Sequence, residues 1–252
     1  MKPQIVLVTG ASAGFGAAIA RRFAADGARV VLAGRRGERL DALAAELGPK
    51  TLALLLDVRD RAAVEAAIAG LPAEFAAIDL LVNNAGLALG LEPAHRASLD
   101  DWEQMVDTNI KGLMYLTRAV LPGMVERGRG HVINIGSTAG EWPYPGGNVY
   151  GGTKAFVRHF SLNLLADLVA TPVRVSNIEP GLCGGTEFSN VRFHGDDTKA
   201  AKVYENTTPL LAEDIADSVY WVATRPAHMN INTLSLMPSC QAFGPLAVHR
   251  GG

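Results

Sequence analysis

Short apolar segments alternate with longer amphipathic segments along most of the chain. The short segments predict seven strands, at residues 4–9, 29–34, 51–57, 78–83, 131–136, 173–179 and 231–237. Several are apolar at both alternating positions, which is typical of strands covered on both faces. The longer segments predict helices at residues 15–26, 38–47, 60–70, 99–127, 150–170 and 212–224. The alternation predicts an α/β fold with a doubly wound, seven-stranded parallel sheet and helices on both of its faces.

Nothing in the pattern divides the chain into separate units. There is no internal repeat and no linker, so residues 1–252 are predicted to form a single domain. Residues 181–211 are too long for an ordinary loop, and an insertion after the carboxyl end of a strand usually covers a ligand. We therefore expect a substrate lid there, and a C-terminal tail over residues 238–252. Ser98 followed by Asp101 predicts a capped start for the fourth helix.

Composition and charge narrow the class of protein. Hydrophobic residues make up 48% of the chain, and the net charge is only −2 with no long run of one sign. This argues against a nucleic-acid partner, which usually needs a basic face. No apolar run is long enough to span a bilayer, and the first residues run directly into a strand without a signal peptide. We expect a cytoplasmic protein in which Cys183 and Cys240 are free thiols, with no metal site.

The first predicted strand ends in the glycine-rich stretch TGASAGFG, with a helix directly after it. Small residues in such a turn let the backbone approach a pyrophosphate, and the helix N-terminus offers free N–H groups. The spacing is G-x-x-x-G-x-G, and the alternative is a tight turn that binds no ligand. The functional interpretation is a Rossmann domain for a dinucleotide, with cofactor contacts expected from Thr9, Gly10, Ser12, Gly14, Phe15 and Gly16.

The end of the second strand indicates which dinucleotide binds. An acidic residue at this point would hold a ribose 2′-hydroxyl, but the sequence has Arg35 and Arg36. A guanidinium binds a 2′-phosphate, whereas a carboxylate repels it, so NADP(H) is predicted over NAD(H). Arg35 is the stronger candidate for the phosphate contact. The alternative for Arg36 is a solvated surface charge.

Two further strand ends are predicted to reach the same crevice. Asp57 and Val58 follow the third strand, and Asp57 can accept a hydrogen bond from an adenine amino group. Asn84, Ala85 and Gly86 follow the fourth strand in the stretch VNNAG. Ligands of this kind of fold lie outside the carboxyl ends of the strands, so we expect cofactor contacts from all five residues.

Tyr150 and Lys154 are the candidate reacting groups. Four residues apart on a helix, they share one face. A free phenol has a pKa of about 10, and a nearby ammonium or an oxidised nicotinamide ring lowers it, which makes Tyr150 a proton-transfer group. The alternative is a structural tyrosine near a surface lysine. Gly151 and Gly152 weaken the helix between them, and we expect these glycines to leave room for the ribose and nicotinamide.

Two polar residues complete the candidate catalytic set. Ser137 follows the fifth strand, and its hydroxyl can hold a substrate oxygen or satisfy the strand-end backbone. Asn109 lies within a predicted helix, where asparagine often marks a local bend or a bound water.

Five motifs occur in order along essentially the whole chain: TGASAGFG, NNAG, Asn109 with Ser137, YGGTK, and EPG at residues 179–181. With these motifs the sequence resembles the short-chain dehydrogenase/reductase family. The resemblance implies that Tyr150 is the general acid/base and that Lys154 binds the nicotinamide ribose and lowers the tyrosine pKa. It also implies that Ser137 orients the substrate oxygen, that Asn109 holds a water of the proton relay, and that Pro180 and Gly181 contact the nicotinamide end. Members are usually dimeric or tetrameric, so a homotetramer is expected.

Three longer stretches resemble one subgroup of this family, the bacterial NADP-dependent 3-hydroxy acid dehydrogenases. They are NNAGLALGLEPAH, STAGEWPYPGGNVYGGTKAFVRHFSLNL and EPGLCGGTEFSNVRF. The resemblance implies an enzyme that oxidises serine, allo-threonine or 3-hydroxypropionate; sulfoacetaldehyde reductases are similar. Glu141 stands where a small neutral residue is expected, and SCQAFGP near the C-terminus also diverges.

A small hydroxy acid needs a group that binds its anion, and Arg192 in the lid is the candidate. The alternative is a surface arginine paired with Asp196 or Asp197. Two other functions are open: a reductase of 3-oxoacyl thioesters on a carrier protein, which would need a basic patch that the lid lacks, and a sensor that binds NADP(H) without turnover. Such sensors commonly lose the tyrosine or the lysine, and both are present here.

Overall fold

Seven parallel strands form one sheet in the order β3-β2-β1-β4-β5-β6-β7 in the computed structural model, which describes residues 2–244. The strands are β1 Ile5–Thr9, β2 Arg29–Gly34, β3 Thr51–Leu55, β4 Leu80–Asn83, β5 Gly130–Ile135, β6 Val173–Pro180 and β7 Thr233–Leu236. The strand order reverses between β1 and β4, and this is the point at which doubly wound sheets bind ligands. The predicted sheet is confirmed.

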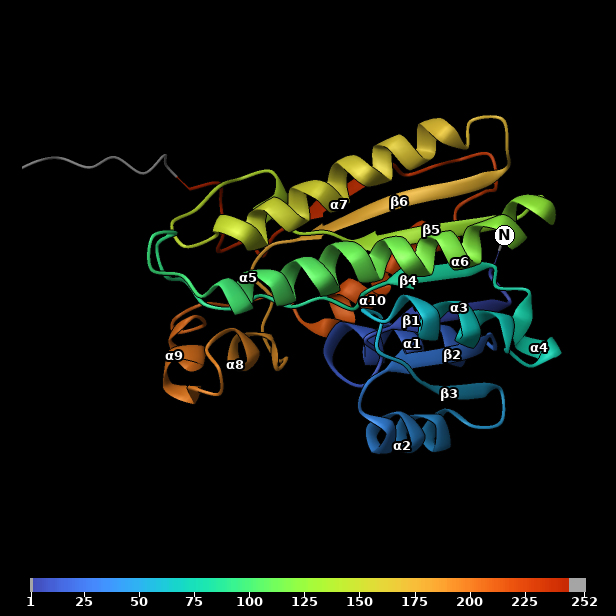
Figure 1. Cartoon of the computed structure of the whole chain (residues 1–252), viewed down its shortest axis with the longest axis horizontal. Helices are drawn as coiled ribbons and strands as arrows, with labels where there is room; N and C mark the ends of the chain where they lie inside the picture. The colour runs from blue at the N-terminus through green and yellow to red at the C-terminus, as the bar shows by residue number, and fades with distance from the viewer. Residues whose placement is uncertain (1, 245–252) are drawn as a thin grey trace, which may run out of the picture.

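Helices cover both faces of this sheet (Figure 1). One face carries α1 Gly14–Ala25, α2 Gly37–Leu47 and α10 Ala212–Ala223. The other carries α3 Arg61–Ala69, α4 Ala73–Ala76, α5 Leu99–Val106, α6 Leu113–Glu126 and α7 Asn148–Asp167. The segment between α5 and α6 is a π-helical turn, Asp107–Gly112, and a short 3₁₀ turn, Thr138–Gly140, precedes α7.

Alternate residues of the central strands fill two separate cores. In β1, Val6 and Val8 pack with Ile19 of α1, whereas Leu7 packs on the other face with Leu116 of α6. All five side chains are completely buried. This double burial explains why the strands are continuously apolar in the sequence.

The lid contains two short helices that the sequence pattern did not predict, α8 Phe188–Arg192 and α9 Asp197–Lys202. In Figure 1 they lie at the end of the sheet where α5 and α7 begin. The predicted helix over residues 99–127 is interrupted by the π-helical turn, and α4 was also missed. The predicted cap is confirmed, because the Ser98 hydroxyl accepts a hydrogen bond from the backbone N–H of Asp101 at 3.3 Å.

Among residues 2–244, no helix combines the length and apolarity needed to cross a membrane. Cys183 and Cys240 are both free thiols, as expected. The predicted tail begins at residue 238, and its part beyond residue 244 lies outside the described residues.

Candidate active site

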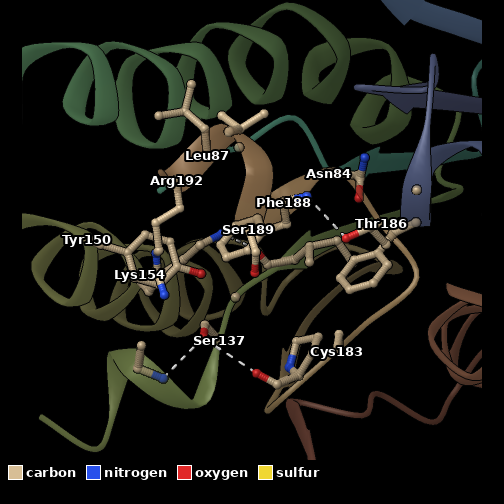
Figure 2. A pocket seen from close by; sticks show the side chains of 18 of the residues that line it. Asn84, Leu87, Ser137, Tyr150, Lys154, Cys183, Thr186, Phe188, Ser189 and Arg192 are labelled. Carbon is tan, nitrogen blue, oxygen red and sulfur yellow. Dashed lines mark hydrogen bonds between the residues drawn. The ribbon is translucent and has the colours of Figure 1, made fainter. Parts of the chain in front are cut away.

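A cavity of about 940 Å³ opens at the carboxyl ends of the strands and runs from the end of β2 to the lid. Most of the predicted site residues line it: Gly10, Ser12, Gly14, Phe15, Arg35, Arg36, Asp57, Val58, Asn84, Ala85, Gly86, Ser137, Tyr150, Lys154, Pro180, Gly181 and Arg192. Figure 2 shows the part of this cavity where side chains from the turn after β5, from α7 and from the lid lie close together. Thr9, Gly16 and Asn109, which were predicted to contact ligand or water, are not part of its wall.

Thr9 and Gly16 support the cofactor turn from behind instead. The buried Thr9 hydroxyl accepts hydrogen bonds from the backbone N–H groups of Asn84 and Ala85, at 3.0 and 2.9 Å. The Asn84 side chain donates in return to the Thr9 carbonyl at 2.8 Å. A Cβ at Gly16 would collide with the carbonyl oxygen of Gly10. These contacts hold the glycine turn against the stretch after β4, and a direct cofactor contact stays a prediction for both residues.

The two arginines after β2 differ in their partners. Arg36 donates through Nε to the Ser12 hydroxyl at 2.9 Å and pairs with the carboxylate of Glu187, a lid residue, at 2.6 Å. Arg39 pairs with the other oxygen of that carboxylate at 2.8 Å. Hydrogen bonds from Arg36 and then Arg39 hold the pKa of Glu187 below its ordinary value. Arg36 is therefore more than a solvated surface charge, and Arg35 lines the cavity beside it.

Asp57 has a partner that the sequence analysis missed. Its carboxylate forms an ion pair with Arg59 at 2.6 Å, and the hydrogen bonds from Arg59 lower the pKa of Asp57. The residue lines the cavity in its ionised form, which suits the predicted role of a hydrogen-bond acceptor.

Tyr150 and Lys154 lie one turn apart at the start of α7, and both are buried. The Lys154 ammonium lies 5.9 Å from the centre of the Tyr150 ring. It donates a hydrogen bond of 2.8 Å to the carbonyl oxygen of Ile135 at the end of β5. This bond holds the lysine at the floor of the cavity, next to Gly86.

Burial dominates the acidity of both groups. Loss of solvent raises the pKa of Tyr150 to about 12, although Ser137 and Arg192 each oppose the rise. Burial also lowers the pKa of Lys154 to about 8. In the protein alone, desolvation of the phenolate outweighs the positive charge of Arg192, and a lowered phenol pKa remains a prediction for the complex with the oxidised nicotinamide.

Ser137 lies just beyond β5 and beside the Tyr150 phenol. Its hydroxyl accepts a hydrogen bond of 3.1 Å from the N–H of Ala139 and lies 3.5 Å from the carbonyl oxygen of Pro180. The side chain therefore satisfies the backbone of the 3₁₀ turn, and it also faces the cavity (Figure 2). The two interpretations of Ser137 are compatible in this geometry.

Asn109 sits in the π-helical turn, which agrees with the bend expected there. Its amide is buried and bonds to the backbone N–H and C=O of Leu87, both at 2.9 Å. It also donates to the Thr153 hydroxyl at 3.0 Å. Asn109 thus connects the stretch after β4 to the helix that carries Tyr150 and Lys154. The Asn109 side chain is turned toward Leu87 and Thr153 and does not form part of the cavity wall.

The glycines inside the YGGTK motif do not border the cavity, contrary to expectation. A Cβ at Gly151 would lie 3.1 Å from the carbonyl oxygen of Ala139. Gly151 therefore allows the turn after Ser137 to approach α7 closely. A Cβ at Gly152 would meet no atom within 4 Å.

Arg192 points from the end of α8 into the cavity, toward Tyr150 (Figure 2). Its guanidinium carbon lies 5.1 Å from the centre of the Tyr150 ring and 5.2 Å from that of Phe188. One terminal nitrogen donates to the Tyr144 hydroxyl at 3.0 Å. The buried Nε has no hydrogen-bond partner among residues 2–244. A buried donor without a partner is costly, so this N–H is available to an acceptor that residues 2–244 do not supply.

The alternative for Arg192 was a surface pairing with Asp196 or Asp197, and this alternative is wrong. Asp196 pairs with Lys199 at 3.3 Å, and Asp197 accepts from the Asn190 amide at 2.6 Å.

Two residues in stretches that looked divergent have clear roles. Glu141 pairs at 2.8 Å with Arg158 of α7, which also binds the buried Glu179 at 2.8 Å. Gln241 from the C-terminal segment lines the cavity and accepts a hydrogen bond of 2.6 Å from the N–H of Leu182. A Cβ at Gly181 would collide with the Gln241 side chain. Neither contact has a local signal in the sequence.

The fold and this arrangement of tyrosine, lysine and serine define a class of enzyme. The model of the short chain dehydrogenase family matches residues 4–196, and the chain belongs to that family.

Relatives within the family are similar over almost their whole length. The chain is 69% identical to the NADP-dependent 3-hydroxy acid dehydrogenase YdfG of Salmonella typhi, over 98% of this chain and 100% of the relative. It is 51% identical to the serine 3-dehydrogenase of Agrobacterium fabrum, over 97% and 98%. A solved closed form of serine dehydrogenase complexed with NADP+ matches with a TM-score of 0.97 and 66% identity, over 98% of this chain and 100% of that one. NADP, which is the cofactor of the Salmonella typhi relative and is bound in the solved closed form, is the cofactor that Arg35 and Arg36 predicted.

Proposed function

We propose that the protein interconverts a small 3-hydroxy acid, such as serine, L-allo-threonine or 3-hydroxypropionate, and its 3-oxo acid or semialdehyde. NADP is its cofactor. The observation that carries the substrate class is the guanidinium of Arg192, which has a buried, unpartnered Nε and lies over the ring of Tyr150. A guanidinium binds a carboxylate through two parallel hydrogen bonds, so this position suits the acid group of a short substrate.

The cavity fits the cofactor at its other end. Gly10 and Gly14 have positive φ angles of 64° and 52°, which a glycine adopts without strain. A Cβ at Gly10 would come within 3.0 Å of Asn84 and Ala85, so only a bare backbone passes here. Arg35 would hold the 2′-phosphate. When bound, the oxidised cofactor supplies a hydride acceptor and a positively charged ring near the phenol.

The protein's own groups orient the substrate and move the proton. The Ser137 hydroxyl binds the oxygen on carbon 3, and Tyr150 takes the hydroxyl proton during oxidation or returns it during reduction. Since burial raises the pKa of Tyr150 to about 12, the phenol keeps its proton at neutral pH. The resting site is therefore ready to act as an acid in carbonyl reduction. For oxidation the phenol must first lose its proton, which requires additional positive charge nearby. The ammonium of Lys154 supplies part of this charge.

The runner-up substrates differ in the anion or in size. A sulfonate such as sulfoacetaldehyde suits the same guanidinium. A 3-oxoacyl thioester on a carrier protein would need a basic rim, but Glu187 and Asp196 in the lid offset its arginines and lysines. A 3-ketoacyl-(acyl-carrier-protein) reductase from Brucella melitensis shares the fold with a TM-score of 0.82 at 28% identity. A sensor without turnover is the weakest candidate, because Tyr150 and Lys154 are both in place.

Assembly and location complete the proposal. We place the enzyme in the cytoplasm as a homotetramer in which α6 and α7 form interfaces. Exposed apolar side chains on these two helices support this arrangement, among them Met114, Val125 and Leu162. Sedimentation of the purified protein tests it.

One assay tests the substrate class. NADPH absorbance is followed with L-serine, D-serine, L-allo-threonine, 3-hydroxypropionate, sulfoacetaldehyde and an acyl thioester, for the wild type and for Arg192→Gln. We expect turnover of the small hydroxy acids, and a KM raised by roughly 10- to 100-fold in the variant, because hydrogen bonds to a charged group contribute about 1.5–3 kcal/mol. A small alcohol without an acid group is the control, and its KM should be the same for the variant and the wild type. An unchanged KM for every acid would place the anion elsewhere.

A further inference from the structure

The lid helix α8 connects the two ends of the cavity. It contains the five residues Phe188–Arg192, with Glu187 as the residue that precedes it. At 1.5 Å per residue, these five residues span only about 7.5 Å, so the two ends of the helix are close neighbours. Whatever holds Glu187 in place therefore also influences where Arg192 lies.

The N-terminal end of α8 is held by a two-armed ion pair. The carboxylate of Glu187 lies between Arg36 at 2.6 Å and Arg39 at 2.8 Å, one arginine on each oxygen. Arg36 is also part of the cavity wall and bonds to Ser12 of the glycine turn. Arg39 lies on α2 outside that wall, and it lines a smaller neighbouring pocket together with Gly14 and Glu187.

The C-terminal end of α8 is attached to the substrate side of the cavity. The carbonyl oxygen of Arg192 accepts a hydrogen bond of 2.9 Å from the N–H of Gly90. The guanidinium of Arg192 binds the Tyr144 hydroxyl, and His194 just beyond binds Asp101 at 3.1 Å. With both ends held, the lid lies across the cavity.

We propose that Glu187 is a positioning residue: by joining Arg36 and Arg39 it keeps α8 closed, and so it holds Arg192 over Tyr150 for the substrate anion. This inference rests on the proposed function, in which Arg192 binds the acid group. Two guanidinium groups, those of Arg36 and Arg39, share the single carboxylate of Glu187, so a net positive charge remains for a 2′-phosphate while Glu187 stays bound. Because Arg36 belongs to both the cavity wall and the ion pair, opening of the lid and release of the cofactor are linked.

The effect should be moderate, since the side chains of Arg36 and Glu187 remain 44% and 46% exposed and exposed ion pairs are weak. In Glu187→Gln we expect the KM for the hydroxy acid and the dissociation rate of NADPH to rise about two- to fivefold. The kcat should stay within about twofold, because the reacting groups are untouched. Hydrogen exchange of peptides from the lid should become faster in the protein without ligand.

A double-mutant cycle separates positioning from a general loss of charge. Arg39→Gln should give the same changes as Glu187→Gln, and the double variant should be no worse than either single one. Glu46→Gln is the matched control. It removes an exposed carboxylate that binds Arg21 through two bonds of 2.7 and 2.8 Å, away from the lid. It should change none of the three measurements.

The outcomes keep the two proposals apart. If Glu187→Gln behaves like Glu46→Gln in lid exchange, NADPH release and KM, the positioning role is wrong. If lid exchange and NADPH release rise but neither Glu187→Gln nor Arg192→Gln alters the KM, Glu187 still closes the lid, and the proposed role of Arg192 fails instead.

Discussion

At the cofactor end of the cavity much of the wall is backbone, whereas at the substrate end it is side chains that arrive from distant parts of the chain. The turn after β1 is formed by consecutive residues, and its glycines are required by contacts such as that of Gly16 with the Gly10 carbonyl. Around Tyr150, by contrast, Arg192 comes from the lid and Gln241 from the C-terminal segment. A backbone wall suits a cofactor shared by many enzymes, and a wall of side chains allows the substrate to differ.

The substitution with the largest expected effect should reduce turnover at the substrate end and leave cofactor binding at the other end unchanged. Tyr150→Phe removes the proposed proton-transfer group, and because such a group typically contributes 10²–10⁴-fold, we expect kcat to fall about 10³-fold. NADPH affinity, measured by fluorescence titration, should be nearly unchanged, because the phenol hydroxyl is not part of the glycine turn. A comparable loss of NADPH binding would show that the two ends are not independent.

Lys154 lies where the two ends meet, and its burial predicts a dependence of stability on pH. Its folded pKa of about 8 lies below the ordinary value of 10.5, so between these values the unfolded state binds more protons. The free energy of unfolding from this group therefore rises with pH, by about 2 kcal/mol between pH 7.5 and 10. Urea unfolding of the wild type and of Lys154→Met, compared across this range, measures the difference. A constant difference would mean that the ammonium is solvated.

The smallest effects are expected from two glycine substitutions, one in the cofactor turn and one in α7. Gly16→Ala forces a Cβ against the Gly10 carbonyl, so we expect at least about 1 kcal/mol of destabilisation and weaker NADPH binding. Gly152→Ala meets no atom within 4 Å on an exposed face of α7 and should stabilise the protein by about 1 kcal/mol with turnover unchanged. Thermal unfolding measures the stability of both variants, and titration with NADPH measures their affinity for the cofactor. Equal effects would indicate that the cofactor turn tolerates side chains.

The sequence predicted the sheet, the single domain and most of the cavity wall, because these depend on local patterns. The Arg35–Arg36 pair indicated NADP, and the motif YGGTK supplied the candidate reacting groups. Thr9, Gly16 and Asn109 lie behind the cavity wall, which the sequence did not predict. Their residue types are visible in the sequence, but the direction of a side chain relative to a cavity is not.

By itself, the sequence determined the elements and their order, since the period of the apolar residues selects strand or helix and parallel strands bring their carboxyl ends to one edge. Only the tertiary structure decided that Arg192 turns inward, that Glu187 joins Arg36 and Arg39, and that burial raises the Tyr150 pKa. Each of these depends on groups far apart in the chain, and on how much water their packing excludes.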